Sequence, residues 1–215
     1  MNGLLEKPII CLITKGNSDH SNFKSRKTEI LALVGVAAEA GISLVQIREK
    51  NLSARSLFVL TQDAVEITRG SRTRILVNGR ADVALAAGAD GVHLPADGLS
   101  ANAIRQNFPP DFLIGVSTHS LQEALNARFE GADFVTFGPV FESPGKGKPH
   151  GLEMLSTLSA LLHPFPVVAL GGVDESNYAN VMKSEASGFA AIRFLNKESN
   201  LRELFQSGRL VDQYD

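Results

Sequence analysis

Residues 81–94 read ADVALAAGADGVHL, and this stretch contains the pattern that decides the fold. A segment with helical spacing ends at the Ala-Gly-Ala-Asp junction of residues 87–90, and a short apolar run at 91–94 follows directly. Glycine is favoured where a helix stops before the next element begins. Similar junctions recur at residues 40–42, 130–133 and 187–189. The recurrence indicates a chain assembled from repeated strand and helix units.

Eight short, almost entirely apolar runs alternate with longer segments of helical spacing. The runs are residues 9–14, 43–48, 74–78, 91–94, 112–117, 133–138, 166–170 and 188–193. The predicted helices are residues 24–40, 53–69, 81–87, 100–107, 121–129, 152–162, 175–183 and 201–206. Continuous apolar runs are typical of strands covered on both faces, as in a parallel sheet. Because no long linker interrupts the units, we predict an α/β fold with one domain over residues 1–215, a single (β/α)₈ TIM barrel. An open doubly wound sheet fits less well.

The composition narrows the class of protein. With 44% hydrophobic and 20% charged residues, the chain is ordinary for a soluble globular protein. A formal net charge of −2 gives no broad basic surface, so we expect no nucleic-acid partner. The chain has no apolar run near the ~18 residues of a membrane helix and no apparent signal peptide, so we expect no membrane partner and a cytoplasmic location. The single cysteine, Cys11, lies in an apolar run and is expected to be buried in a strand.

Polar residues stand at the ends of several predicted strands. In a TIM barrel the strand C-termini and the loops that follow build the active site. The polar residues that we place there are Gln46, Arg48, Lys50, Asn78, Ser117 and His119, with Lys146 from the Gly- and Pro-rich loop of residues 142–151. Together with Arg193, the three cations among them predict a locally basic mouth that binds a phosphorylated small molecule. Any one of these cations alone could equally be a solvated loop residue.

The dipeptide Gly171-Gly172 follows the seventh predicted strand. Without a Cβ atom, the backbone amides of glycine can approach a phosphate closely, and a following helix N-terminus adds favourable partial charge. The loops after the seventh and eighth strands are the usual phosphate site of this fold. We therefore predict a phosphate site there, although a Gly-Gly pair by itself is more often a simple turn.

Two histidines lie in or next to predicted strands. His119 follows the fifth strand and is predicted to face the mouth, where a histidine can both take and give a proton near neutrality. A histidine that caps the next helix is the alternative. His93 lies inside the fourth strand and is expected to pack there. No spacing of His, Cys, Asp or Glu resembles a zinc site.

Several short stretches, in this order along the chain, form a recognisable set: residues 11–14 (CLIT), 46–50 (QIREK), 78–80 (NGR), 91–94 (GVHL), 114–120 (IGVSTHS), 137–141 (FGPVF), Lys146 and 169–172 (ALGG). In these pieces the sequence resembles the thiamine phosphate synthase/TenI family, and the likeness covers most of its length. The resemblance implies an enzyme of thiamine biosynthesis with a thiazole phosphate as its small-molecule partner, and a possible homodimer. One branch joins a hydroxymethylpyrimidine diphosphate to the thiazole phosphate with magnesium, and the TenI branch tautomerises a thiazole carboxylate phosphate.

Two departures from the synthase pattern favour the TenI branch. Synthases carry metal-binding aspartates where this chain has Gly79 and Gly98, although Asp97 lies one residue away. Losing two carboxylates should weaken a magnesium site, so a tautomerase without a cofactor is our first expectation. In that case His119 moves the proton. The ligand phosphate then lies on the backbone amides around Gly171, Gly172, Ile192 and Arg193.

Two other functions stay open. A thiamine phosphate synthase would use magnesium, with Asp97 as the replacement ligand, and would hold the diphosphate on Arg48, Lys50, Asn78 and Lys146. A non-catalytic regulator that binds a phosphorylated ligand is the third possibility.

Overall fold

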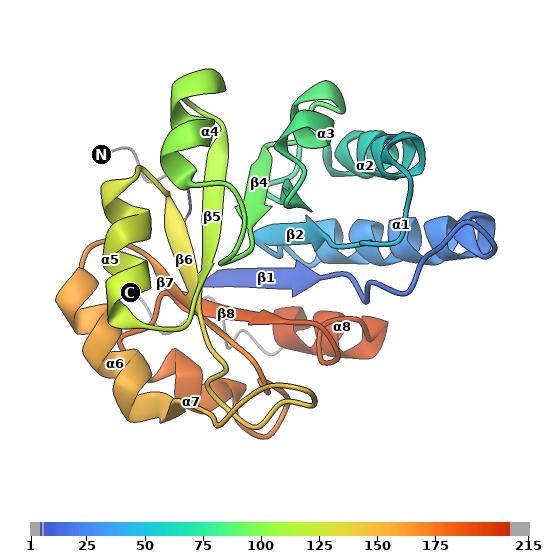
Figure 1. The fold of residues 1–215 in the computed structure, drawn as a ribbon. Coiled ribbons are helices and arrows are strands. Elements are labelled where there is room, and N and C mark those ends of the chain that lie inside the picture. The colour runs from blue at the N-terminus through green and yellow to red at the C-terminus, as the bar shows by residue number, and fades with distance from the viewer. Residues whose placement is uncertain (1–4, 6, 207–215) are drawn as a thin grey trace.

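The computed structural model describes Leu5 and residues 7–206, which form a closed barrel of eight parallel strands in the order β1 to β8 with helices around it (Figure 1). The strands are β1 Ile9–Ile13, β2 Leu44–Ile47, β3 Arg74–Asn78, β4 Gly91–Leu94, β5 Leu113–Thr118, β6 Phe134–Phe137, β7 Val167–Leu170 and β8 Gly188–Ala191. The helices are α1 Phe23–Glu39, α2 Ala54–Thr68, α3 Ala81–Ala86, α4 Ala101–Asn107, α5 Leu121–Phe129, α6 Gly151–Leu162, α7 Tyr178–Met182 and α8 Glu198–Gln206. The predicted (β/α)₈ barrel is confirmed.

The strands are buried on both faces, which explains their continuous apolar character. One set of their side chains fills the barrel interior: Ile9, Cys11, Ile13, Leu44, Leu76, Leu113, Phe134, Val168 and Ala190. Alternate residues such as Ile10 and Leu12 pack outward against the helices. Cys11 is buried as expected, and burial raises the pKa of its thiol to about 12. The thiol is therefore not a nucleophile at neutral pH.

The aspartates of the repeated junctions hold the N-terminal end of the barrel together. Asp90 Oδ2 accepts a hydrogen bond from the backbone N–H of Ile75 at 2.7 Å. Asp133 Oδ2 accepts one from the N–H of Ile114, also at 2.7 Å, and pairs with Arg105 at 2.7 Å. Both carboxylates thus tie one strand to the next. Because they lie at the end opposite the mouth, their role is stability.

Most predicted boundaries lie within one residue of those observed, and the largest differences lie in the last two helices. Helix α7 begins three residues later than predicted because the segment before it forms a side-chain-stabilised turn. Asp174 Oδ1 accepts hydrogen bonds from the N–H and Oγ of Ser176, and Asn177 Oδ1 accepts one from the N–H of Asp174. Such local bonds compete with helix formation. Helix α8 begins at Glu198, three residues earlier than predicted.

Candidate active site

A cavity of about 740 Å³ opens at the C-terminal end of the barrel. Every residue that we predicted for the site lines it: Gln46, Arg48, Lys50, Asn78, Asp97, Ser117, His119, Lys146, Gly171, Gly172, Ile192 and Arg193. They come from strands β2 to β5, β7 and β8 or from the segments that follow them, and from the loop after β6. The barrel brings them together because its parallel strands all end at this face. Their individual roles stay predictions.

The cavity wall is strongly cationic. Arg48, Lys50, Lys146 and Arg193 line it, and within the described part of the chain none of the four lies within ion-pair distance of a carboxylate. Asp97 is the one acidic side chain among the described lining residues. Unpaired cations in a concave site concentrate positive potential, which favours a ligand with several negative charges.

The turns after β7 and β8 present free backbone donors to the cavity. Among the described residues, no acceptor takes the N–H of Gly171, Gly172, Ile192 or Arg193. The second turn is fixed by Asn196, whose Nδ2 donates to the carbonyls of Ile13 at 2.7 Å and Ile192 at 2.6 Å. Four unpaired N–H groups on two adjacent turns fit the predicted phosphate site.

Glycine is required at positions 171 and 172 for a second, structural reason. Gly171 has φ of +94° and Gly172 has φ of +68°. A Cβ at Gly171 would lie 2.6 Å from Cα of Pro139, and one at Gly172 would lie 2.4 Å from the carbonyl oxygen of Glu142. The turn after β7 therefore packs directly against the backbone of the loop after β6, and only glycine leaves room for this contact.

His119 lies at the mouth and does not cap the following helix. The cap of α5 is Ser120, whose Oγ accepts from the N–H of Glu123 at 3.2 Å. The ring Nδ1 of His119 contacts the carbonyl oxygen of Gly138. A carbonyl only accepts, so Nδ1 carries the proton in this contact and the neutral ring keeps Nε2 as a proton acceptor. The geometry fits the predicted position of His119.

The floor of the cavity contains a buried polar pair that sequence reasoning missed as a site feature. His93 is 3% exposed, as its predicted packing role requires, but it also lines the cavity with Thr136. The ring Nε2 lies 3.3 Å from Oγ1 of Thr136. Burial lowers the pKa of His93 to about 4, so the ring is neutral at pH 7. Reading alternate residues of β4 and β6 as inward-facing could have found this pair.

His93 should make stability depend on pH between about 4 and 6.5. In this window the unfolded chain takes up a proton that the folded chain excludes. The free energy of unfolding is therefore unaffected by protonation of His93 above about pH 6.5. It declines by up to about 1.4 kcal/mol per pH unit as the pH falls towards 4. Urea unfolding of wild type and His93→Gln across this range should show a smaller decline in the variant. His20→Gln, at an exposed site, is the control and should follow wild type; parallel curves for wild type and His93→Gln would contradict the assignment.

Gly79 and Gly98, at the two positions where we expected synthases to carry aspartates, lie in turns that suit glycine. Gly79 has φ of +67°, and a Cβ at Gly98 would lie 2.9 Å from Cδ of Pro95. Within the described residues, no group of three or more His, Cys, Asp or Glu side chains is placed to hold a metal ion. Asp97 is the one carboxylate among the described residues that line the cavity. Mg²⁺ is commonly held by one or two carboxylates plus substrate phosphates, so this donor set fits the ion only together with a phosphorylated substrate.

Over residues 5 and 7–206, no helix is both long enough and apolar enough to cross a membrane. The expected homodimer and cytoplasmic location stay predictions.

Comparisons with known proteins agree on one family. The family model described as thiamine monophosphate synthase matches residues 10–195. The chain is 41% identical over 178 residues to a protein of Geobacter sulfurreducens named "Putative thiamine-phosphate synthase", covering 81% of this chain and 83% of that protein. It is 36% identical over 203 residues to thiamine-phosphate synthase of Chlorobium luteolum, covering 93% and 91% of the two chains. The solved structure of thiamine phosphate pyrophosphorylase from Pyrococcus furiosus matches with a TM-score of 0.77 at 30% identity, over 93% of this chain and 96% of that chain. The chain therefore belongs to the thiamine monophosphate synthase family and is an enzyme of thiamine biosynthesis.

Proposed function

We propose that the chain is a thiamine-phosphate synthase, which joins hydroxymethylpyrimidine diphosphate to thiazole phosphate and releases pyrophosphate. The observation that carries the proposal is one cavity lined by two separate groups of donors suited to anions. Free backbone amides lie after β7 and β8, whereas Arg48, Lys50 and Lys146 lie after β2 and β6. Two phosphorylated substrates need two such groups. The names of the relatives also favour this reaction over the tautomerase that the two missing aspartates led us to expect.

The cationic region suits the departing pyrophosphate. Transfer breaks the bond between carbon and the diphosphate oxygen, and negative charge grows on the leaving group. We assign charge-assisted hydrogen bonds to this group to Arg48, Lys50 and Lys146. The three line the cavity, and no carboxylate among the described residues pairs with them. Donors fixed in advance where charge develops are usually the largest single contribution to catalysis. Magnesium, held by Asp97 and the diphosphate, would supply further charge neutralisation.

The remaining polar residues suit orientation of the rings. Gln46 is 2% exposed and lines the deep part of the cavity. Its amide both donates and accepts, which matches the edge of an aminopyrimidine. The thiazole phosphate is assigned to the amides of Gly171, Gly172, Ile192 and Arg193. With these assignments, the two reacting rings would lie between the two groups of donors.

Incubation of the purified chain with both substrates tests the proposal. We expect thiamine phosphate and pyrophosphate in equal amounts, loss of product in excess chelator, and recovery with magnesium. Asp97→Asn should raise the magnesium concentration at half-maximal rate roughly tenfold, equivalent to about 1.4 kcal/mol of metal affinity. Asp82→Asn is a matched control, because Asp82 pairs with Arg80 and does not line the cavity. Full activity in chelator would contradict the role of Asp97.

The thiazole tautomerase stays as a second candidate because of one observation. The contact of His119 Nδ1 with the carbonyl of Gly138 leaves Nε2 free to move a proton at the mouth. A chain that aromatises the thiazole carboxylate phosphate in chelator, and makes no thiamine phosphate, would show this activity instead. Binding of a thiazole phosphate without turnover of either substrate set would indicate the regulator.

A further inference from the structure

Glu49 is a buried carboxylate beside the cavity that takes no part in lining it. Gln46, Arg48 and Lys50 line the cavity from the C-terminal end of β2 and the residues that follow it. Glu49 lies between two of them in sequence and is 3% exposed. Successive side chains of an extended chain point to opposite sides, so Glu49 turns away from the ligand. A carboxylate is costly to bury unless it is hydrogen-bonded, so its partners indicate its role.

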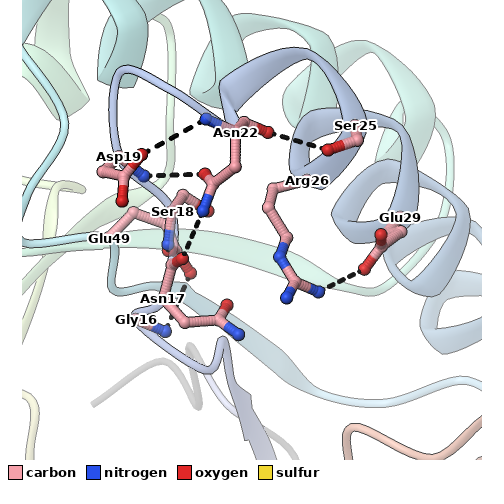
Figure 2. Close-up of polar contacts among 9 residues, drawn as sticks. All are labelled: Gly16, Asn17, Ser18, Asp19, Asn22, Ser25, Arg26, Glu29 and Glu49. Carbon is pink, nitrogen blue, oxygen red and sulfur yellow. Dashed lines mark hydrogen bonds and ion pairs between the residues drawn. The ribbon is translucent and has the colours of Figure 1, made fainter.

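The partners of Glu49 are backbone groups of the loop between β1 and α1. Oε1 accepts from the N–H of Gly16 at 3.0 Å, and Oε2 accepts from the N–H of Ser18 at 2.8 Å (Figure 2). Both oxygens of the carboxylate thus bind the same loop. Bonds from backbone N–H groups to a charged acceptor are stronger than bonds between neutral groups. Glu49, which directly follows Arg48, therefore ties this loop to the segment after β2.

The rest of the loop is held together by hydrogen bonds of its own side chains. Asn22 Oδ1 accepts from the N–H of Asp19 at 2.8 Å, and its Nδ2 donates to the carbonyl of Asn17 at 3.1 Å (Figure 2). The N–H of Asn22 in turn donates to Oδ1 of Asp19 at 3.2 Å. With the loop internally braced, the contact with Glu49 sets where the whole segment sits against β2.

The same loop packs directly against Arg48. A Cβ added to Gly16 would lie 2.8 Å from Nη1 of Arg48 and 3.0 Å from its carbonyl oxygen. The N–H of Arg48 donates to Oγ1 of Thr14, at the start of the loop, at 2.8 Å. In the described part of the chain no carboxylate pairs with this guanidinium. The backbone of Gly16 therefore packs against the guanidinium and limits the directions that the Arg48 side chain can take.

We propose that Glu49 is a positioning residue that acts through Arg48. By holding Gly16 and Ser18, it keeps the loop pressed against the guanidinium, which then faces the diphosphate before the substrate arrives. The inference rests on the proposed function, because it assigns Arg48 to the pyrimidine diphosphate. Fixing a donor in advance improves binding by removing the entropy of ordering it.

Glu49→Gln is the first test, since it keeps the size of the side chain but points an NH₂ group at one of the two backbone N–H donors. The KM for the pyrimidine diphosphate should rise at least about tenfold, while the KM for the thiazole phosphate changes less than about twofold. Gly16→Ala should give the same split, because the new methyl group displaces the guanidinium and strains a backbone with φ of +74° whose N–H binds Glu49. Glu29→Gln is the matched control: Glu29 is an exposed carboxylate nearby that pairs with Arg26, and its loss should change neither KM (Figure 2).

A double-mutant cycle separates positioning from general loss of structure. In an Arg48→Ala background, Glu49→Gln should change the KM for the diphosphate less than about threefold, because the group on which it acts is gone. Full additivity of the two substitutions, or an equal rise in both KM values, would overturn the positioning role.

Binding of inorganic pyrophosphate with magnesium, measured by calorimetry on the same variants, separates this inference from the proposed function. The affinity should fall about tenfold in Glu49→Gln and in Arg48→Ala, without a further fall in the double variant. Wild-type protein that binds pyrophosphate while Glu49→Gln binds it equally well would overturn only the positioning role. Wild-type protein that binds no pyrophosphate would overturn the proposed function and the role of Arg48 with it.

Discussion

Lys146→Met should lower kcat for thiamine phosphate formation by about 10²–10³-fold, the usual result of removing one preorganised donor to developing charge. Lys146 lies in the loop between β6 and α6 and lines the cavity. Its N–H donates to the carbonyl of Ser143 at 3.1 Å, so a turn defines where the side chain starts. Methionine keeps an unbranched apolar side chain of similar length and removes the charge together with its hydrogen-bond donors. The loss should therefore appear mainly in kcat, where charge on the leaving pyrophosphate matters.

Lys148→Met is the matched control for this prediction. Lys148 is an exposed lysine of the same loop, two positions along, and it does not line the cavity. Both variants lose one positive charge, so a general effect of charge would reduce both rates equally. Pre-steady-state and steady-state kinetics at saturating substrates should show the defect in Lys146→Met alone. Equal rates for the two variants would remove Lys146 from the mechanism.

The fold was predictable because its local and long-range requirements agree in the sequence. Each strand is buried on both faces, so the apolar runs are continuous, as at 9–13 in β1. Two of the four repeated junctions, at residues 87–90 and 130–133, combine a glycine of positive φ (Gly88 and Gly131) with an aspartate that bonds to a neighbouring strand. Two helix starts were predicted wrongly by three residues, those of α7 and α8. At α7 the side-chain bonds of Asp174 and Asn177 compete with the helix.

The candidate site residues were predictable where they follow strands, but contacts between distant segments could not be predicted. Parallel strands end at one face, so polar residues that follow the apolar runs meet there. Contacts between distant segments leave no local signal. The amide of Asn196 reaches the carbonyl of Ile13 across 183 positions of sequence, and Glu49 reaches back to Ser18 across 31. The position of Glu49 in sequence, between Arg48 and Lys50, also gives no indication that its side chain turns away from the cavity.

The choice of reaction was the weakest inference from sequence. It depended on two glycines, Gly79 and Gly98, which replace carboxylates but also satisfy local backbone and steric constraints in their turns. Because the turn itself explains each glycine, its presence is weak evidence against a metal site. The cationic wall is the stronger signal, because no described carboxylate pairs with it and no feature of the barrel requires it.

Gly172→Ala should raise the KM for the thiazole phosphate by about 100-fold, since a shift of about 1 Å in a positioning group can cost this much. The new Cβ would lie 2.4 Å from the carbonyl oxygen of Glu142, so either the turn after β7 or the loop after β6 must move. Because the turn after β7 carries the new methyl group, we expect the turn to move and to displace the free amides of Gly171 and Gly172 from the phosphate. The left-handed backbone, with φ of +68°, adds a cost of about 1–2 kcal/mol in stability.

Gly88→Ala separates these two contributions to the Gly172→Ala effect. Gly88 has φ of +72° but nothing within 4 Å of an added Cβ, and it lies at the junction before β4, away from the cavity. It should lose about 1–2 kcal/mol of unfolding free energy in urea with unchanged kinetics, because it carries the backbone strain without the clash. Gly172→Ala should show that loss together with the rise in KM for the thiazole phosphate, while the KM for the pyrimidine diphosphate stays within about threefold of wild type. A Gly172→Ala protein with the stability of Gly88→Ala and wild-type kinetics would show that the phosphate does not bind to the amides after β7.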